Sequence, residues 1–259
     1  MFDPALIAAG AGTGFLVGLT GVGGGALMTP LLMLLFGVFP VTAVATDLWF
    51  AAITKMVAAK VHGGNGHVDW RVVGRLWLGS LPAALLVVTL VALGFSAGKV
   101  AWLGKAIGVM VMIAAIGLLF APRLAALARA RRFSNPESFK ALQPVLTILA
   151  GGALGLGVAL TSVGAGAIGS VMLLYLYPLR MTAHRLVATD IVHAIPLTLV
   201  AGTGYLASGF VDGAMLANLL MGSVPAALAG SVISQKIPAR KLQIGLAVTL
   251  LLSGLRVFS

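Results

Sequence analysis

The sequence predicts an all-α integral membrane protein built from two inverted repeats, each with a broken, re-entrant helix pair and three transmembrane helices. Of its 259 residues, 60% are hydrophobic and only 9% are charged, whereas soluble domains are roughly one-quarter charged. Runs such as residues 76–94 contain no acid or base, and about 20 such residues make a helix that crosses the hydrocarbon core. The alternating segments of about 10 residues that are typical of membrane β-barrels are absent.

The chain contains an internal duplication, because four short blocks of its first half recur in the same order in its second half. The first is TGVGGG at 20–25, which corresponds to TSVGAG at 161–166. The others are VATD at 44–47 and 187–190, GxVD at 66–69 and 209–212, and GSxPAAL at 79–85 and 222–228. We therefore predict a first transmembrane repeat over residues 1–121, a polar cytoplasmic linker over 122–143, and a second transmembrane repeat over 144–259.

The distribution of basic residues favours one of two topologies. Residues 4–36 would form a helix of about 50 Å, too long for one crossing, so the glycine-rich break makes either an interrupted crossing or a hairpin that does not cross. With the linker in the cytoplasm, the hairpin model gives inverted repeats with 13 basic residues inside and 3 outside, whereas the parallel model gives 9 and 7. Cytoplasmic loops are enriched in Lys and Arg. We expect a multi-pass protein of the bacterial inner membrane with both termini extracytoplasmic.

The two glycine-rich breaks predict an anion site near the bilayer midplane. A helix N-terminus exposes unpaired N–H groups and carries a partial positive charge, and inverted repeats with broken helices are a transporter architecture. The alternative is that these glycines only allow helices to pack closely. The residues expected to bind the anion are Thr20, Gly21, Gly23, Gly24 and Gly25 in the first half, and Thr161, Ser162, Gly164 and Gly166 in the second.

Four ionisable residues are expected within the membrane, where charges are costly and therefore indicate function. Asp47 and Asp190 occupy matching positions, and Lys55 and His193 follow them on roughly the same helical faces. One hypothesis is that the acids and His193 take up a proton as the anion moves, while Lys55 attracts the anion. The alternatives are that each Thr-Asp pair caps a helix start and that Lys55 extends to the membrane interface.

One motif carries a family resemblance. It is G-x-G-x-x-x-G-L-T-G-V-G-G-G at 12–25, followed by Pro30, with Ala-Val-Ala-Thr at 43–46 and copies of both elements in the second half. On these residues the chain resembles the sulfite exporter TauE/SafE family over almost its whole length. The second copy departs from the first with TSVGAG and with Val171 in place of Pro30. The resemblance implies export of sulfite or organosulfonates, and by extension of other small sulfur-containing anions or organic acids.

The function that we predict is therefore secondary transport, with export of a small anion and proton coupling, and not catalysis. No Walker-type phosphate-binding motif is present, and we predict no cofactor and no metal site. The expected partners are the anion and the lipid bilayer, with no nucleic acid, and a homo-oligomer is left open. Two alternatives are a non-transporting membrane scaffold subunit and a membrane-embedded serine hydrolase, in which Ser162 and His193 would form a dyad.

Overall fold

The computed structural model describes residues 2–20, 25–62, 68–93 and 136–234, together with parts of 105–127. All regular structure in these residues is helical, which confirms the predicted all-α class. The first half contains α1 (Pro4–Thr20), α2 (Gly25–Leu35), α3 (Pro40–His62) and α4 (Trp70–Ala92). The second contains α6 (Pro136–Thr161), α7 (Ala167–Leu176), α8 (Ala183–Ala207) and α9 (Gly213–Ser234).

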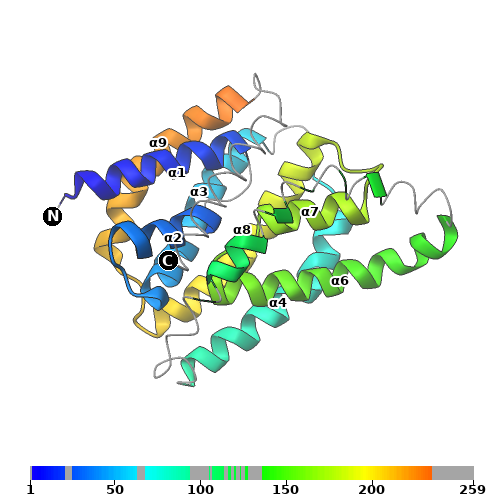
Figure 1. Ribbon diagram of the computed structural model, residues 1–259, viewed down its shortest axis with the longest axis horizontal. Coiled ribbons are helices and arrows are strands. Elements are labelled where there is room, and N and C mark those ends of the chain that lie inside the picture. Colours follow the sequence, from blue (N-terminus) through cyan, green and yellow to red (C-terminus); the bar gives the residue numbers. More distant parts are fainter. Residues whose placement is uncertain are drawn as a thin grey trace.

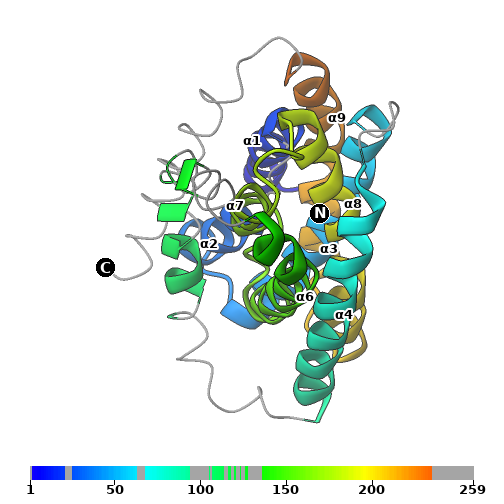
Figure 2. The same cartoon turned by 90° about the vertical axis from the view of Figure 1, so that its right-hand side faces the viewer.

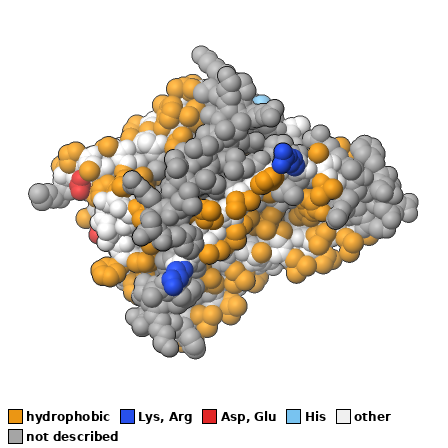
Figure 3. All heavy atoms as spheres, in the orientation of Figure 1, with side chains coloured by type: hydrophobic (Ala, Val, Ile, Leu, Met, Phe, Trp, Pro, Cys, Tyr) orange, Lys and Arg blue, Asp and Glu red, His pale blue; other side chains and the backbone are white. Residues whose placement is uncertain are grey.

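Five of the described helices are long and apolar enough to cross a membrane, namely α3, α4, α6, α8 and α9. Large apolar side chains on the outer helices are exposed, among them Leu78 on α4, Leu149 on α6 and Val232 on α9. Figure 3 shows broad areas of hydrophobic side chains on the face in view, with Lys and Arg only at isolated points. An apolar exterior over helices of this length is that of a multi-pass membrane protein.

The two equivalent helices α3 and α8 form the centre of the molecule. α1 packs along α9 and α4 packs along α6, with α3 and α8 between these pairs (Figures 1 and 2). The indole Nε1 of Trp49 donates to the carbonyl of Gly202, whereas Lys55, further along α3, lies beside Asp190, nearer the start of α8. Residue numbers thus rise along α3 as they fall along α8, so the two helices are antiparallel.

The outer helix pairs are held by glycines at which the neighbouring backbone leaves no space for a side chain. A Cβ atom added at any of four glycines would overlap backbone atoms of the facing helix. The facing residues are Gly10–Leu219 and Gly14–Ser223 between α1 and α9, and Gly151–Leu76 and Gly155–Ser80 between α6 and α4. The helices therefore pack closely through small residues at these glycines. Each of the two contacts between α1 and α9 has its repeat counterpart between α6 and α4.

The repeated VATD and GxVD blocks contact each other across the two halves. The hydroxyl of Thr46 accepts from the backbone N–H of Asp212 at 3.2 Å, and the hydroxyl of Thr189 accepts from the N–H of Asp69 at 3.0 Å. These equivalent hydrogen bonds place the start of α9 against α3 and the start of α4 against α8. The recurring VATD and GxVD blocks thus contribute equivalent contacts between the halves.

The helix pair α6–α7 folds back on itself, so that the end of α7 lies beside the first half of α6. The side chain of Gln143, in the first half of α6, donates to the carbonyl of Leu176 at the end of α7 at 2.7 Å. One turn on, the hydroxyls of Thr147 and Tyr177 lie 2.8 Å apart. α6 begins at Pro136, inside the stretch 122–143 that was expected to be a linker. Proline is well suited to the first turn of a helix, which is consistent with this starting point.

Candidate functional site

The break between α6 and α7 is confirmed at residues 162–166. Ser162 has a φ of 57°, and Gly164 and Gly166 have φ values of 134° and 124°, a region that side-chain-bearing residues rarely adopt. Gly166 is the N-cap of α7, and the helix starts at Ala167. Residues 161–166 are all buried, so irregular backbone with a helix N-terminus lies inside the protein.

The first break can be followed only at its edges. Gly21, Gly23 and Gly24 lie outside the described residues, while Thr20 ends α1 and Gly25 begins α2. The hydroxyl of Thr20 donates to the carbonyl of Leu16 at 2.7 Å.

Thr161, the repeat counterpart of Thr20, bonds in the same way. Its hydroxyl donates to the carbonyl of Gly157 at 2.6 Å and accepts from the N–H of Val163. The two threonine hydroxyls that were expected to donate to an anion therefore give their protons to their own helices.

Asp47 and Asp190 are buried well inside their helices. Their exposed fractions are 0% and 1%, α3 begins at Pro40, and the N-cap of α8 is Thr182. Each acid thus lies about two turns from its helix start, at 3.6 residues per turn. The alternative that the Thr-Asp pairs are helix caps is wrong.

Lys55 is also buried, with an exposed fraction of 1%. Its ammonium donates to the carbonyl of Ala165 in the break at 3.2 Å and lies 3.7 Å from Oδ2 of Asp190. The alternative that Lys55 extends to the membrane interface is therefore wrong. The structure brings together the predicted residues Lys55 and Asp190 with the second glycine-rich break.

Each acid faces the N-terminal part of the short helix of its own half. Oδ2 of Asp47 accepts from the hydroxyl of Thr29 in α2 at 2.5 Å. Oδ1 of Asp190 lies against Gly169 in the first turn of α7, where an added Cβ would come within 2.6 Å of it. A negative charge is stabilised at a helix N-terminus, so the carboxylate of Asp190 lies at the position that was predicted for a bound anion.

The centre is incompletely hydrogen bonded. Among the described residues, the buried atoms without a hydrogen-bond partner include Oδ1 of Asp47, both carboxylate oxygens of Asp190, Oγ of Ser162 and Nδ1 of His193. The Ser162 side chain is near the Asp47 carboxylate, but no hydrogen bond of good geometry joins them. Because buried polar groups are normally bonded, these atoms leave capacity for a proton or a ligand.

His193 is directed toward α4, so it does not form the dyad of the hydrolase alternative. Its Nε2 lies 3.0 Å from the hydroxyl of Ser80, and its carbonyl accepts from the indole of Trp77 at 3.1 Å. His193 thus links α8 to the first half, one turn beyond Asp190, and no hydrogen bond joins it to Ser162.

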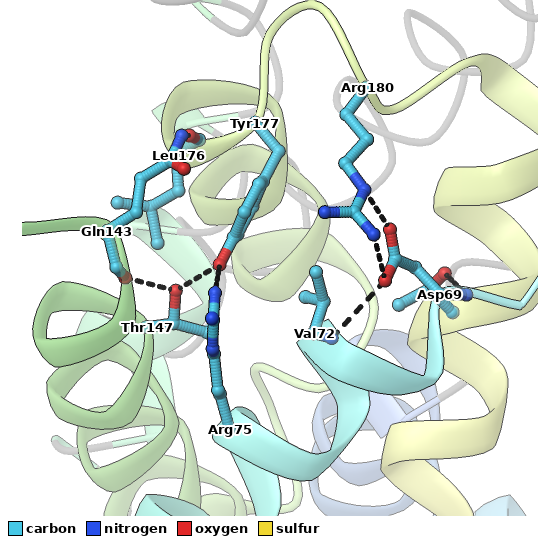
Figure 4. Close-up of polar contacts among 9 residues, drawn as sticks. Asp69, Val72, Arg75, Gln143, Thr147, Leu176, Tyr177 and Arg180 are labelled. Atoms are coloured by element: carbon cyan, nitrogen blue, oxygen red, sulfur yellow. Dashed lines mark hydrogen bonds and ion pairs between the residues drawn. The ribbon is translucent and has the colours of Figure 1, made fainter. Parts of the chain in front are cut away.

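A salt bridge between the halves was not anticipated from the sequence. Asp69 is buried, with 3% exposure, and receives Nη2 of Arg180 at 2.9 Å and also its Nε (Figure 4). The same carboxylate accepts from the N–H of Val72 and so caps α4. The recurrence of Asp69 in the GxVD block was the available signal, but Arg180 was counted only as a basic residue of a loop.

A second polar contact ties α4 to the hairpin. Arg75 donates to the hydroxyl of Tyr177 at 3.2 Å, and that hydroxyl also contacts Thr147 (Figure 4). Together with the Asp69–Arg180 pair, this contact joins the start of α4 to the segment between α7 and α8 at two points.

Buried charges at a helix break, within a bundle of membrane-length helices, define the architecture of a membrane transporter. The family model described as Sulfite exporter TauE/SafE matches residues 6–257, and the chain belongs to this family.

Similar proteins bear transporter names. The chain is 37% identical over 259 residues to the "Probable membrane transporter protein YjnA" of Bacillus subtilis (strain 168), covering 97% of this chain and 98% of that protein. It is 27% identical to the "Probable membrane transporter protein YdhB" of the same organism, over 93% and 94% of the two chains. No solved structure matches the chain significantly. The comparisons and the architecture agree on a membrane transporter.

Proposed function

We propose that the chain is a secondary transporter that exports a small anion, namely sulfite, an organosulfonate or a related sulfur-containing anion, with proton coupling. The description of the family supports the substrate class. The observation that carries the proposal is the buried contact of Lys55 with Ala165 and Asp190. It places an ammonium group beside the N-terminus of α7, which is a suitable environment for an anion.

Coupling follows from competition between the anion and Asp190. Among the described residues buried within the membrane-length helices, Lys55 is the one lysine or arginine, and the carboxylate of Asp190 is its present partner. A substrate anion that enters must displace this carboxylate from Lys55 and from the first turn of α7. Protonation of Asp190 removes the competing negative charge, so anion and proton bind together and cross together, and export down the anion's own concentration gradient carries the proton outward with it.

The arrangement of the halves supports alternating access. The antiparallel packing of α3 and α8 and the exchanged Thr46–Asp212 and Thr189–Asp69 hydrogen bonds fit two halves related by a twofold axis in the membrane plane, with first and second repeats at 1–121 and 144–259. The excess of basic residues supports a cytoplasmic position for the polar stretch 122–143, the last part of which forms the start of α6. Both termini are then outside the inner membrane of a bacterium.

The test is efflux from liposomes that contain purified protein and are loaded with sulfite, thiosulfate, sulfate, an alkylsulfonate or a carboxylate. We expect saturable efflux of at least one sulfur-containing anion, accelerated when the loaded side is acidic. In Asp190→Asn, which imitates the protonated side chain, efflux should continue but lose its dependence on pH. A protein that moves none of the anions would be the scaffold of the alternative prediction, and an unchanged pH profile in Asp190→Asn would refute the coupling role.

A further inference from the structure

We propose that the ammonium of Lys55 fills the place of a coupling cation, so that the transporter uses protons and does not bind sodium. This inference rests on the proposed function, because it explains why the same site couples to protons and excludes sodium. Unwound backbone carbonyls at helix breaks coordinate coupling cations in other transporters. Here that position, at the carbonyl of Ala165 and the carboxylate of Asp190, is taken by a cation covalently attached to α3.

The surroundings of Lys55 match those of a bound cation. The ammonium donates a hydrogen bond to one backbone carbonyl at 3.2 Å and lies 3.7 Å from one carboxylate oxygen. The side chain is only 1% exposed. Hard cations prefer oxygen ligands of these two kinds. A sodium ion at this place would have to displace Lys55 or lie against its charge, and two cations so close repel strongly in a buried environment.

Three ionisable side chains face Lys55, namely two carboxyl groups and one imidazole. Asp47 lies on the same helix, and Asp190 and His193 come from α8. The residues of α9 and α2 that hydrogen-bond α3 here, Ser223 and Thr29, are uncharged, and neither helix contains an acidic or basic residue. One ammonium balances one carboxylate, so the second carboxyl group requires another positive charge, and a proton on Asp47 or Asp190 supplies it without a further binding site.

The two halves differ at this position, which gives a natural replacement for the test. The repeat counterpart of Lys55 is Thr198, whose hydroxyl donates to the carbonyls of Ala194 and Ile195 in its own helix. Lys55→Thr therefore introduces a side chain that the same fold already contains at the equivalent place. Lys60, exposed on the same helix, provides a charge-matched control as Lys60→Thr.

The experiment measures the melting temperature of detergent-solubilised protein in sodium, potassium and choline chloride at equal ionic strength, without any anionic substrate beyond chloride. Wild type and Lys60→Thr should melt at the same temperature in all three salts. In choline, the melting temperature of Lys55→Thr should be lower than that of the wild type. Sodium should raise this melting temperature specifically, because the cation position is open in the variant. A sodium-specific shift in the wild type, or equal melting of Lys55→Thr in all three salts, would overturn the inference.

Should Lys55→Thr fail to fold, the wild type alone decides through its response to sodium in melting and in liposome efflux. Sodium-independent efflux that depends on pH supports the inference, and efflux that stops without sodium overturns it. The result is separable from the proposed function. If the protein transports no anion but sodium stabilises only Lys55→Thr, the inference about the cation position is supported and the proposed transport function is refuted.

Discussion

Replacing Gly151 with alanine tests whether the close approach of α6 to α4 stabilises the assembled halves. The new Cβ would overlap the carbonyl oxygen of Leu76 and lie 3.0 Å from its Cα, and these backbone atoms can move only with α4. Overpacking of this kind costs about 1–3 kcal/mol. At the neighbouring Gly152 the nearest atom, the carbonyl oxygen of Gly79, would lie at an ordinary 3.9 Å. Both substitutions gain the same helix propensity, about 0.5–1 kcal/mol. The difference between their free energies of unfolding, about 1–3 kcal/mol, therefore measures the cost of the overlap alone.

The assay is unfolding of the detergent-solubilised variants by SDS, followed through tryptophan fluorescence. We expect Gly151→Ala to be less stable than Gly152→Ala by that difference. The first half offers the same comparison, because a Cβ at Gly10 would overlap the carbonyl of Leu219, whereas one at Gly12 meets nothing within 4 Å. Equal stability within both pairs would show that the helices separate without cost and would refute the argument from close packing.

Two further predictions concern buried hydrogen bonds. Ser80→Ala leaves the imidazole of His193 without its partner at 3.0 Å, so the free energy of unfolding should fall by about 1–3 kcal/mol; an unchanged value in the SDS assay would contradict this. Thr29→Val keeps the shape of the side chain but removes the donor at 2.5 Å from Asp47. We expect the free energy of unfolding to fall by a similar amount, about 1–3 kcal/mol. The loss should be smaller in acidic buffer, because a protonated Asp47 has less need of a hydrogen-bond donor. Equal losses at acidic and neutral pH would argue against this explanation.

The sequence predicted the helices and the break of the second half because both depend on local pattern. Hydropathy sets the length of a membrane helix, and the glycines in TSVGAG allow the positive φ values seen at Gly164 and Gly166. Contacts between distant residues could not be read in this way. Lys55 bonds Ala165, 110 residues away, and Asp69 bonds Arg180, 111 residues away. Only the tertiary packing of α3 and α4 against the second half brings these groups together.

The helix-cap alternative failed because it assumed helices that start late. Helix caps at Asp47 and Asp190 would require α3 and α8 to begin just before them, but these helices start at Pro40 and Ala183. The threonines of the breaks were expected to offer donors to a ligand, yet Thr20 and Thr161 satisfy their hydroxyls on the preceding turn. In an apolar environment that bond is always within reach of a helical threonine, so a hydroxyl next to a break is weak evidence of a binding residue.

The duplicated backbone contacts are equivalent in the two halves, but the charges at the two ends are not, and this difference should set the rate of transport. Near Thr189 the halves are joined by the Asp69–Arg180 salt bridge in addition to the backbone bond. At the equivalent end, the backbone of Asp212 bonds Thr46, and the described residues show no salt bridge for the Asp212 carboxylate. If α4 and α8 separate there during transport, the salt bridge must break in each cycle.

Arg180→Gln should therefore lower the stability of the protein while raising the maximal rate of efflux. The side chain of Arg180 is 38% exposed, so solvent reduces the contribution of the pair to about 1 kcal/mol, which corresponds to about a fivefold change in rate when this separation limits turnover. Asp212→Asn, at the end without a salt bridge, is the matched control and should leave the maximal rate unchanged. A slower Arg180→Gln, or equal acceleration in both variants, would mean that the ends joined by Asp69 and Arg180 stay together throughout the cycle.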